Sequence, residues 1–181
     1  MGEKFFTAKK LATLGVLTAL SLITFLIENL FPPLIIPGAK LGLANAFSFI
    51  ALIMYSPLEA FIIVAARTLL GAMFAGNLSA VMYSFTGGVV SMAASSLLLY
   101  LVHPRISVIC VSVIAAALHN VTQNIVFVAV YSTPIAFSYL PYLILIGVLS
   151  GAFIGAAVTL LVKRIPTSAF ARLYGSKSFK N

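Results

Sequence analysis

The chain has 181 residues, of which 62% are hydrophobic and only 8% are charged, and its mean hydropathy is +1.16. A soluble domain of this size needs more charged groups than this on its surface. The composition therefore excludes a soluble globular protein and indicates an integral membrane protein. The net charge of +8 comes from Lys and Arg residues near the two ends of the chain, where they flank apolar segments as cytoplasmic anchors do, so it does not indicate nucleic-acid binding.

Prolines, glycines and charged residues divide the apolar sequence into six predicted spans. The first covers residues 11–29 and stops before Pro32 and Pro33, because proline lacks the amide that a helix needs. It is longer than the apolar part of a secretory signal and more spans follow it, so we expect it to be retained. The second helix, about 41–55, is short for a bilayer that takes about 20 helical residues to cross. We expect it to be recessed or sheltered by protein.

The remaining spans are separated by breaks rich in proline, glycine or polar residues, and cover about residues 57–74, 78–101, 106–131 and 136–162. Pro57 suits the first turn of the third span, where its missing amide hydrogen costs nothing. We therefore predict an all-α fold, a compact bundle of six transmembrane helices. It covers residues 1–165, and a polar cytoplasmic tail covers residues 166–181.

The distribution of Lys and Arg predicts the orientation of this bundle. With a cytoplasmic N-terminus, the outer loops hold Lys40 alone, Arg67 lies within a span, and the other cations fall on the inner side. Positive residues are enriched on the cytoplasmic side of membrane proteins. We therefore expect both termini to be cytoplasmic in a multi-pass protein of the cell membrane.

Arg67 lies about ten residues into the third span, so a helical rise of 1.5 Å per residue puts it roughly 15 Å deep, near the midplane. An arginine there costs about 2.5–3.5 kcal/mol on insertion scales, a cost that a partner or a water-filled cavity usually relieves. Two interpretations stay open at this point. Arg67 either faces a ligand or forms a structural ion pair, for which Glu28 of the first span is the candidate partner.

The sequence HNVTQN, residues 119–124, places five polar residues in an otherwise apolar span. His119 and Gln123 share one face of the helix, and Asn120 and Asn124 share the adjacent face. For any one of these residues, a polar contact between helices explains the sequence as well as ligand binding does. Their density favours a wet pocket.

The sequence PGAKLGLAN, residues 37–45, puts Lys40 and Asn45 at the outer end of the second span. Lys40 alone could be an interface lysine that reaches the lipid headgroups. Together with Arg67 and His119 it makes a set of donors on the outer side of the bundle, with Glu28 as the only acid to compensate them, which suits an anionic ligand. The predicted substrate-binding residues are Lys40, Asn45, Arg67, Tyr83, Phe85, His119, Gln123 and Asn124.

The sequence lacks the features of an autonomous enzyme. It contains no Asp, whereas the magnesium ions that serve diphosphate chemistry prefer paired carboxylates. It has no P-loop and no Ser/His/acid set, and His103 and His119 do not have the spacing of a metal site. Cys110 is the only cysteine, so no intrachain disulfide can form. We expect no catalytic activity, no metal and no cofactor.

Small residues recur along the start of the first span, at Ala8, Ala12, Gly15 and Ala19. Such a stripe lets another helix pack closely against the span. That helix could belong to a partner protein or to the chain's own bundle.

The order of these motifs resembles the Gx transporter family, whose older name is heptaprenyl diphosphate synthase component I. The resemblance covers about residues 8–163 and is carried by TAKKLATLGVLTAL, PGAKLGLAN, AARTLLGAMFAGN, SFTGGVVS and HNVTQN. That family is similar to the S components of energy-coupling factor transporters, six-helix proteins that bind a vitamin-like solute from outside. S components pair with a transmembrane coupling subunit and two ATPase subunits. In them an Ala-x-x-x-Ala stripe on the first helix meets the coupling subunit, and this stripe maps to Ala8 and Ala12.

The resemblance implies a substrate-binding membrane subunit with no energy source of its own, which takes a small anionic solute related to a vitamin or an isoprenoid. The older family name implies an alternative, a membrane accessory subunit of polyprenyl diphosphate synthesis. In that case the same cations would hold a diphosphate and the apolar bundle would hold a prenyl chain. Co-purification with ATPases or with an aspartate-rich soluble synthase separates the two.

Overall fold

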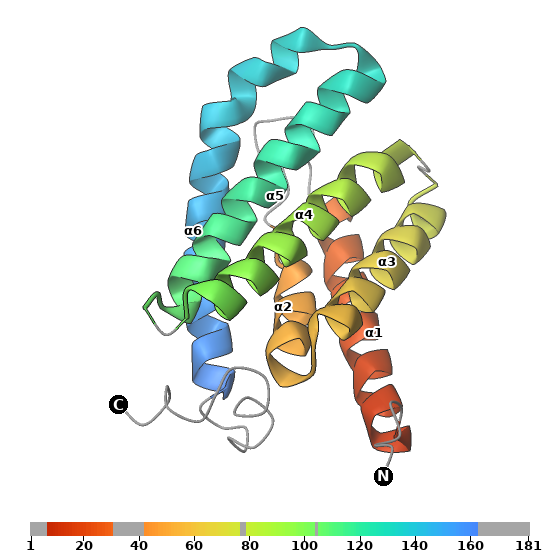
Figure 1. Ribbon diagram of the computed structural model, residues 1–181. Coiled ribbons are helices and arrows are strands. Elements are labelled where there is room, and N and C mark those ends of the chain that lie inside the picture. Colours follow the sequence, from red (N-terminus) through yellow and green to blue (C-terminus); the bar gives the residue numbers. More distant parts are fainter. Residues whose placement is uncertain (1–6, 31–41, 77–78, 104, 163–181) are drawn as a thin grey trace.

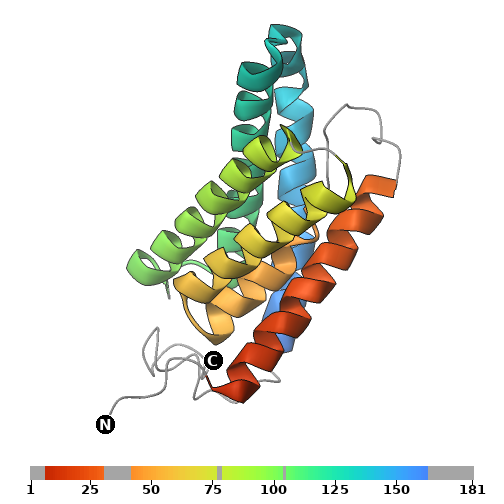
Figure 2. The ribbon, with the colours of Figure 1, turned by 90° about the vertical axis from the view of Figure 1, so that its right-hand side faces the viewer.

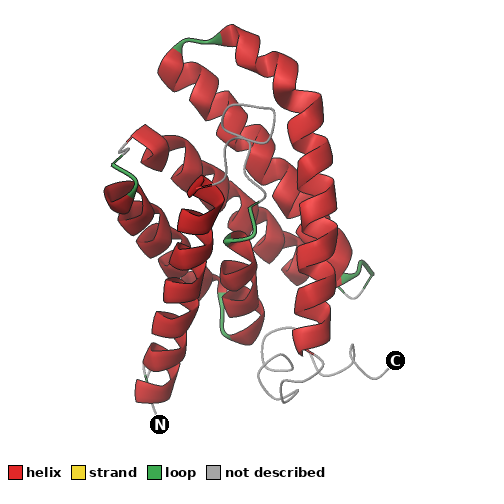
Figure 3. Cartoon of the chain, turned by 180° about the vertical axis from the view of Figure 1, so that it is seen from behind, coloured by secondary structure: helices red, strands yellow, loops and turns green. Residues whose placement is uncertain are grey.

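A computed structural model describes residues 7–30, 42–76, 79–103 and 105–162. Within these ranges the chain is all helical and has no strand, as Figure 3 shows from behind. The elements are α1 (Ala8–Leu30), α2 (Asn45–Met54), α3 (Pro57–Phe74), α4 (Ser79–Leu101), α5 (Val108–Tyr131), the 3₁₀ helix η1 (Pro134–Tyr139) and α6 (Leu140–Val162). The all-α prediction is therefore confirmed for the described residues. The predicted tail, 166–181, lies outside them.

The predicted breaks coincide with the ends of helices. Pro57 occupies the first turn of α3, after an extended Ser56. The hydroxyl of Ser107 caps α5 by accepting the Cys110 N–H at 3.1 Å. α5 ends at Ser132, whose φ of 49° is left-handed. Proline and hydroxyl residues thus set these helix boundaries by local chemistry.

In the part of the chain that the structure describes, five helical segments are long and apolar enough to cross a membrane, and α2 is not among them. With ten residues, α2 is about 15 Å long, roughly half the hydrocarbon thickness of a bilayer. It packs against α1, α3, α4 and α6 and contributes Phe49, Leu52 and Ile53 to the central apolar cluster. The protein is thus a helical multi-pass membrane protein. Its second helix is recessed inside the bundle and is shorter than a full span.

Figures 1 and 2 show how the helices are arranged. The start of α1 and the end of α6 lie at the same end of the bundle, and the turn between α5 and α6 lies at the opposite end. The two ends are called inner and outer after the orientation that the sequence predicts. The turn after α2 is also directed to the inner end, and the turn after α3 is directed to the outer end. This alternation agrees with the order of crossings expected from the sequence.

Glycines hold α6 against α5. A Cβ added at Gly151 would lie 2.7 Å from the Cα of Val113, and one added at Gly155 would lie 2.7 Å from the Cα of Ile109. At Gly147 it would lie 3.0 Å from the Cα of Ala117. The backbones of the two helices approach so closely that only hydrogen fits between them, which is how small residues at intervals of four join membrane helices.

α1 has two faces of different character. Leu14, Leu17, Ser21 and Phe25 are buried against the bundle. The stripe residues Ala8, Ala12, Gly15 and Ala19 lie on the opposite side and are exposed, and a Cβ added at Gly15 would meet nothing within 4 Å. The stripe therefore does not pack against the described part of its own bundle.

A partly buried ion pair ties the inner end of α1 to α3. Lys10 pairs with Glu59, which lies in the first turn of α3 and is 3% exposed. The hydroxyl of Ser56 donates a hydrogen bond to the same carboxylate. The Lys10 ammonium also lies 5.5 Å from the centre of the Tyr55 ring. Because both charges are satisfied, this cluster fixes the inner end of α1 and leaves its outward stripe unobstructed.

Candidate functional site

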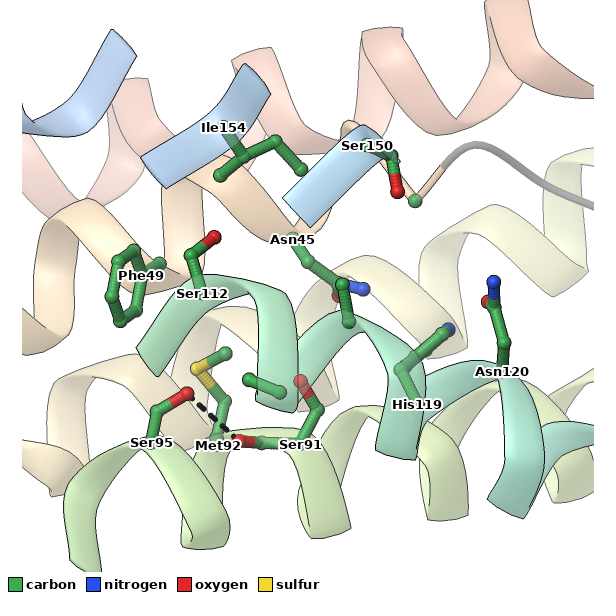
Figure 4. A pocket seen from close by; sticks show the side chains of 13 residues that line it. Asn45, Phe49, Ser91, Met92, Ser95, Ser112, His119, Asn120, Ser150 and Ile154 are labelled. Atoms are coloured by element: carbon green, nitrogen blue, oxygen red, sulfur yellow. Dashed lines mark hydrogen bonds between the residues drawn. The ribbon is translucent and has the colours of Figure 1, made fainter. Parts of the chain in front are cut away.

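A pocket lies between α2, α4, α5 and α6, at the level where α2 begins (Figure 4). The empty space among its lining atoms is about 360 Å³, a figure that includes the part that opens to solvent. Its lining mixes hydroxyl, amide and imidazole groups with apolar side chains and comprises Gly42, Asn45, Phe49, Ser91, Met92, Ser95, Ser112, Ala115, Ala116, His119, Asn120, Ser150 and Ile154.

Asn45 and His119 are the predicted binding residues that line this pocket. Gly42 and Asn120, from the same two sequence motifs, line it as well. The short helix α2 therefore brings the end of PGAKLGLAN into the middle of the bundle, beside the HNVTQN segment of α5. Lys40 lies outside the described residues.

Arg67 is 2% exposed and lies behind Asn45. Its Nη2 donates to Oδ1 of Asn45 at 2.9 Å, and its guanidinium carbon lies 5.8 Å from the centre of the Phe25 ring. Its Nε is buried and has no hydrogen-bond partner among the described residues. The guanidinium thus holds one pocket residue in place and retains an unused donor in the interior of the bundle.

Glu28 acts on this arrangement from α1. Its Oε1 accepts the backbone N–H of Leu43 at 2.7 Å, and its charge attracts Arg67 through space. One helical face of α1 also carries Ser21, whose hydroxyl donates to the carbonyl oxygen of Ala44 at 2.7 Å. α1 therefore fixes the turn that leads into α2, where Gly42 has a φ of 71° that favours glycine. Arg67 therefore donates a hydrogen bond to Asn45, and Glu28 acts on it as a countercharge.

The polar residues of α5 divide into two sets. Asn120 donates from Nδ2 to the Leu143 carbonyl oxygen at 2.8 Å, and Asn124 donates from Nδ2 to the Ala136 carbonyl oxygen at 3.1 Å. Both amides thus join α5 to the segment that follows it. Polar contact between helices was one of the two explanations that the sequence left open for these residues, the other being ligand binding. The Oδ1 atom of Asn124 is nevertheless buried, and no described residue gives it a hydrogen bond.

His119 and Gln123 form the other set, one helical turn apart. His119 packs against α4 at Gly87, where an added Cβ would lie 3.0 Å from the His119 carbonyl oxygen and 3.2 Å from Nδ1. Only glycine at that position lets α4 approach the imidazole this closely. Gln123 is 6% exposed, and its Nε2 has no hydrogen-bond partner among the described residues.

The two predicted aromatic residues lie away from the pocket lining. Tyr83 is buried and packs edge-on against Phe127, with ring centres 5.7 Å apart. Phe85 is 38% exposed. Side chains two residues apart on a helix point in directions that differ by about 200°. α4 therefore cannot direct both Tyr83 and Phe85 toward the pocket. The apolar part of the lining comes from Phe49, Met92 and Ile154 instead.

The sequence interpretation missed the serines of the pocket, which are Ser91, Ser95, Ser112 and Ser150. Ser91 and Ser95 lie one turn apart on α4, which is a weak signal for a shared polar face. Serine is also common in membrane helices, where its hydroxyl bonds to its own backbone. Nothing in the sequence distinguishes a serine of this pocket from one that only bonds to its helix.

The described residues contain no group of three or more His, Cys, Asp or Glu side chains that could hold a metal ion. His103 lies in the turn after α4, away from the pocket lining. Partial burial lowers the pKa of His103 below its ordinary value of 6.5. His103 is thus not one of the described residues that line the pocket with His119.

A family model described as heptaprenyl diphosphate synthase component I matches residues 17–161. The chain belongs to this family. The resemblance expected from the sequence motifs is thereby confirmed for this chain. No curated protein matches its sequence.

Among solved structures, the S component of a bacterial ECF transporter matches this chain with a TM-score of 0.67. The match has 20% sequence identity and covers 86% of this chain and 94% of the other. At that identity, the likeness establishes a shared fold. The family's description names one component of a synthase, and the structural match names a transporter subunit.

Proposed function

We propose that this protein is the solute-binding subunit of an energy-coupling factor type transporter in the cell membrane, and that it takes its solute from the outer side. The observation that carries the proposal is a polar pocket inside a bundle that shares the fold of an S component. Buried polar groups are costly in a membrane helix. Their convergence from α2, α4, α5 and α6 on one pocket is explained by a solute that satisfies them.

The proposed solute is small, carries an acidic group, and is related to a vitamin or an isoprenoid. Support for the acidic group comes from Arg67, whose unused Nε donor lies in the interior next to Asn45. Lys40 remains a proposed second cation at the entrance. Phe49, Met92 and Ile154 provide the apolar part of the lining, so the solute would also carry a compact apolar portion.

The proposed partners are a transmembrane coupling subunit and two ATPase subunits. The outward stripe of α1 is the proposed docking face for the coupling subunit. Its small residues are exposed, and the Cβ position of Gly15 is open. Small side chains let a second helix come close enough for extensive contact. The bilayer surrounds the remaining apolar surface of the bundle.

Co-purification tests this function. An affinity-tagged full chain, extracted from its own membranes in mild detergent, is expected to bring down an integral membrane protein and two ATPases. Ala12→Leu should abolish their recovery without changing the yield of the tagged chain, because the longer side chain obstructs close helix contact. Ala93→Leu is the matched control, since Ala93 is an exposed alanine on α4. Undiminished partner recovery with Ala12→Leu would rule out this docking face.

A second candidate function has the family's description as its support. As a membrane accessory subunit of heptaprenyl or polyprenyl diphosphate synthesis, the same tagged chain would bring down an aspartate-rich soluble synthase in place of ATPases. Native mass spectrometry of the purified protein would then show a retained prenyl diphosphate, whereas the first function predicts a smaller polar molecule.

A further inference from the structure

The lining of the pocket is polar but carries no fixed charge. Among the described residues that line it, the polar side chains are two asparagines, four serines and one histidine, and there is no Lys, Arg, Asp or Glu. They come from α2, α4, α5 and α6 (Figure 4). Amides, hydroxyls and a neutral imidazole each both donate and accept hydrogen bonds. This lining therefore suits a partner whose own polar groups donate and accept.

Arg67, the cation that the sequence suggested for ligand binding, lies behind this lining and is not part of it. Its side chain is 2% exposed, and its Nη2 donates to Oδ1 of Asn45 at 2.9 Å. Asn45 belongs to the lining. A solute in the pocket therefore contacts the amide of Asn45, and the guanidinium lies beyond that amide.

The charge of Arg67 is also opposed by a carboxylate. Glu28 attracts the guanidinium through space, and its Oε1 accepts the backbone N–H of Leu43 at 2.7 Å, just before α2. Two opposite charges close to each other partly cancel the potential that each produces farther away. The attraction that Arg67 exerts on an anion in the pocket is therefore weakened by both distance and Glu28.

This arrangement separates charged from uncharged solute groups. A carboxylate that leaves water loses its hydration, and the loss is recovered only when a cation and further hydrogen bonds meet it in the interior. A hydroxyl or amide group loses much less, and hydrogen bonds to serine, asparagine and histidine side chains replace those to water. The described lining therefore favours an uncharged polar group over a carboxylate of the same shape.

We propose that the pocket holds an uncharged part of the solute that carries hydroxyl or amide groups, and that the acidic group of the solute stays outside this lining, at the entrance where Lys40 is the proposed cation. This inference rests on the proposed solute-binding function and narrows its substrate class. It also separates the two candidate functions, because a prenyl diphosphate consists of a charged diphosphate and an apolar chain. Neither part matches an uncharged polar lining.

The test compares benzamide with benzoate on the purified full chain in detergent. The two probes share a compact ring and nearly the same shape, and they differ in charge. Affinity is measured from the rise of the thermal unfolding midpoint with probe concentration. Ionic strength is held constant, so that the general attraction of anions to a chain of net charge +8 is equally screened. Benzamide should bind at least about tenfold more tightly than benzoate, and inorganic diphosphate should not raise the midpoint.

Two neighbouring serines of α4 supply matched variants. Each hydroxyl donates to the carbonyl oxygen four residues earlier, Ser95 to Ser91 and Ser96 to Met92, so neither change should unfold the protein. Ser95 lines the pocket and Ser96 does not. Ser95→Ala should weaken benzamide about two- to tenfold, the value of one neutral hydrogen bond. Ser96→Ala should leave the affinity for benzamide unchanged.

Four results would each overturn the proposal: no binding of benzamide, binding of benzoate that equals or exceeds that of benzamide, a rise of the midpoint with inorganic diphosphate, or an equal effect of the two serine variants. Partner recovery on the tagged chain is measured without any added probe. A failure of the uncharged pocket and a failure of the transporter assignment can therefore be told apart.

Discussion

Two helices at opposite edges of the bundle carry small residues at similar spacing, and the structure uses them differently. On α6, Gly147, Gly151 and Gly155 face α5, and an added Cβ would meet its backbone at 3.0 Å or less. On α1, Gly15 lies in the exposed stripe and has nothing within 4 Å of an added Cβ. A stripe of small residues thus indicates close helix contact without saying whether the second helix belongs to the same chain.

The two helices also differ in how they are attached. α6 is held by backbone-to-backbone packing along its glycines. α1 is held by side chains that reach into the bundle, including Ser21 to Ala44, Glu28 to Leu43 and the ion pair of Lys10 with Glu59. The face of α1 that carries these side chains is opposite the exposed stripe. One face of α1 therefore holds the turn that leads into α2, beside the pocket, and the opposite face is exposed.

The largest effect is expected from Gly151→Leu. The new side chain would have to displace backbone atoms of Val113 and Ser112, which cannot yield as a flexible side chain can. Overpacking of this kind should cost more than about 3 kcal/mol. Size-exclusion chromatography and thermal unfolding in detergent should show little folded protein. A normally folded variant would contradict the backbone packing of α5 and α6.

Arg67→Met should abolish retention of the solute while leaving the yield of folded protein nearly intact, because it removes a buried charge and keeps an apolar stem. Native mass spectrometry of the purified variant checks the retention. If the variant instead disappears from the membrane, Arg67 is a structural residue that Asn45 and Glu28 hold in place.

Ser21→Ala should lower the free energy of unfolding by about 1–3 kcal/mol, because it leaves the buried Ala44 carbonyl without the hydroxyl that α1 supplies. Thr18→Ala is the control, since the Thr18 hydroxyl bonds to Leu14 within α1 itself. Denaturant or thermal unfolding compares the two variants. Equal losses of unfolding free energy in the two variants would mean that the hydrogen bond from Ser21 to Ala44 adds nothing to stability.

The smallest effect on stability is expected from Gly15→Leu, the counterpart of Gly151→Leu. The side chain enters open space and leucine favours helix more than glycine does, so stability should stay within about 0.5 kcal/mol or rise slightly. Partner recovery from membranes should nevertheless be lost. A variant that keeps its partners would show that the stripe only faces lipid.

The sequence predicted most of the fold because its signals are local. Proline at the start of α3 and the Ser-Thr-Pro after α5 act within one turn of themselves, so the helix ends were placed to within a few residues. The neighbouring breaks also predicted that the second helix is short, although α2 covers Asn45–Met54 and the predicted range was about 41–55. What stayed beyond reach was the direction of each side chain, as Phe85 shows by facing away from the pocket.

The candidate site was predicted in part. Polar residues that are rare in an apolar helix, such as Asn45 and His119, stand out in the sequence and line the pocket. Serine is common in membrane helices and does not stand out in this way. Ser95 could be identified as a pocket residue only from the packing of α4 against α5. Glu28 could be proposed as the partner of Arg67, but its contact with Leu43 depends on a turn that joins segments far apart along the chain.

The sequence by itself determined that the protein is a helical membrane bundle with a few costly polar residues inside it, because composition and helix-breaking residues act locally. Only the tertiary structure decided which groups meet. It showed that Arg67 is bonded to Asn45, that Asn120 and Asn124 are fixed by carbonyl groups of the following segment, and that one stripe of small residues is buried while the other is exposed. These outcomes depend on how the helices cross, and the periodicity of a single helix carries no information about its neighbours.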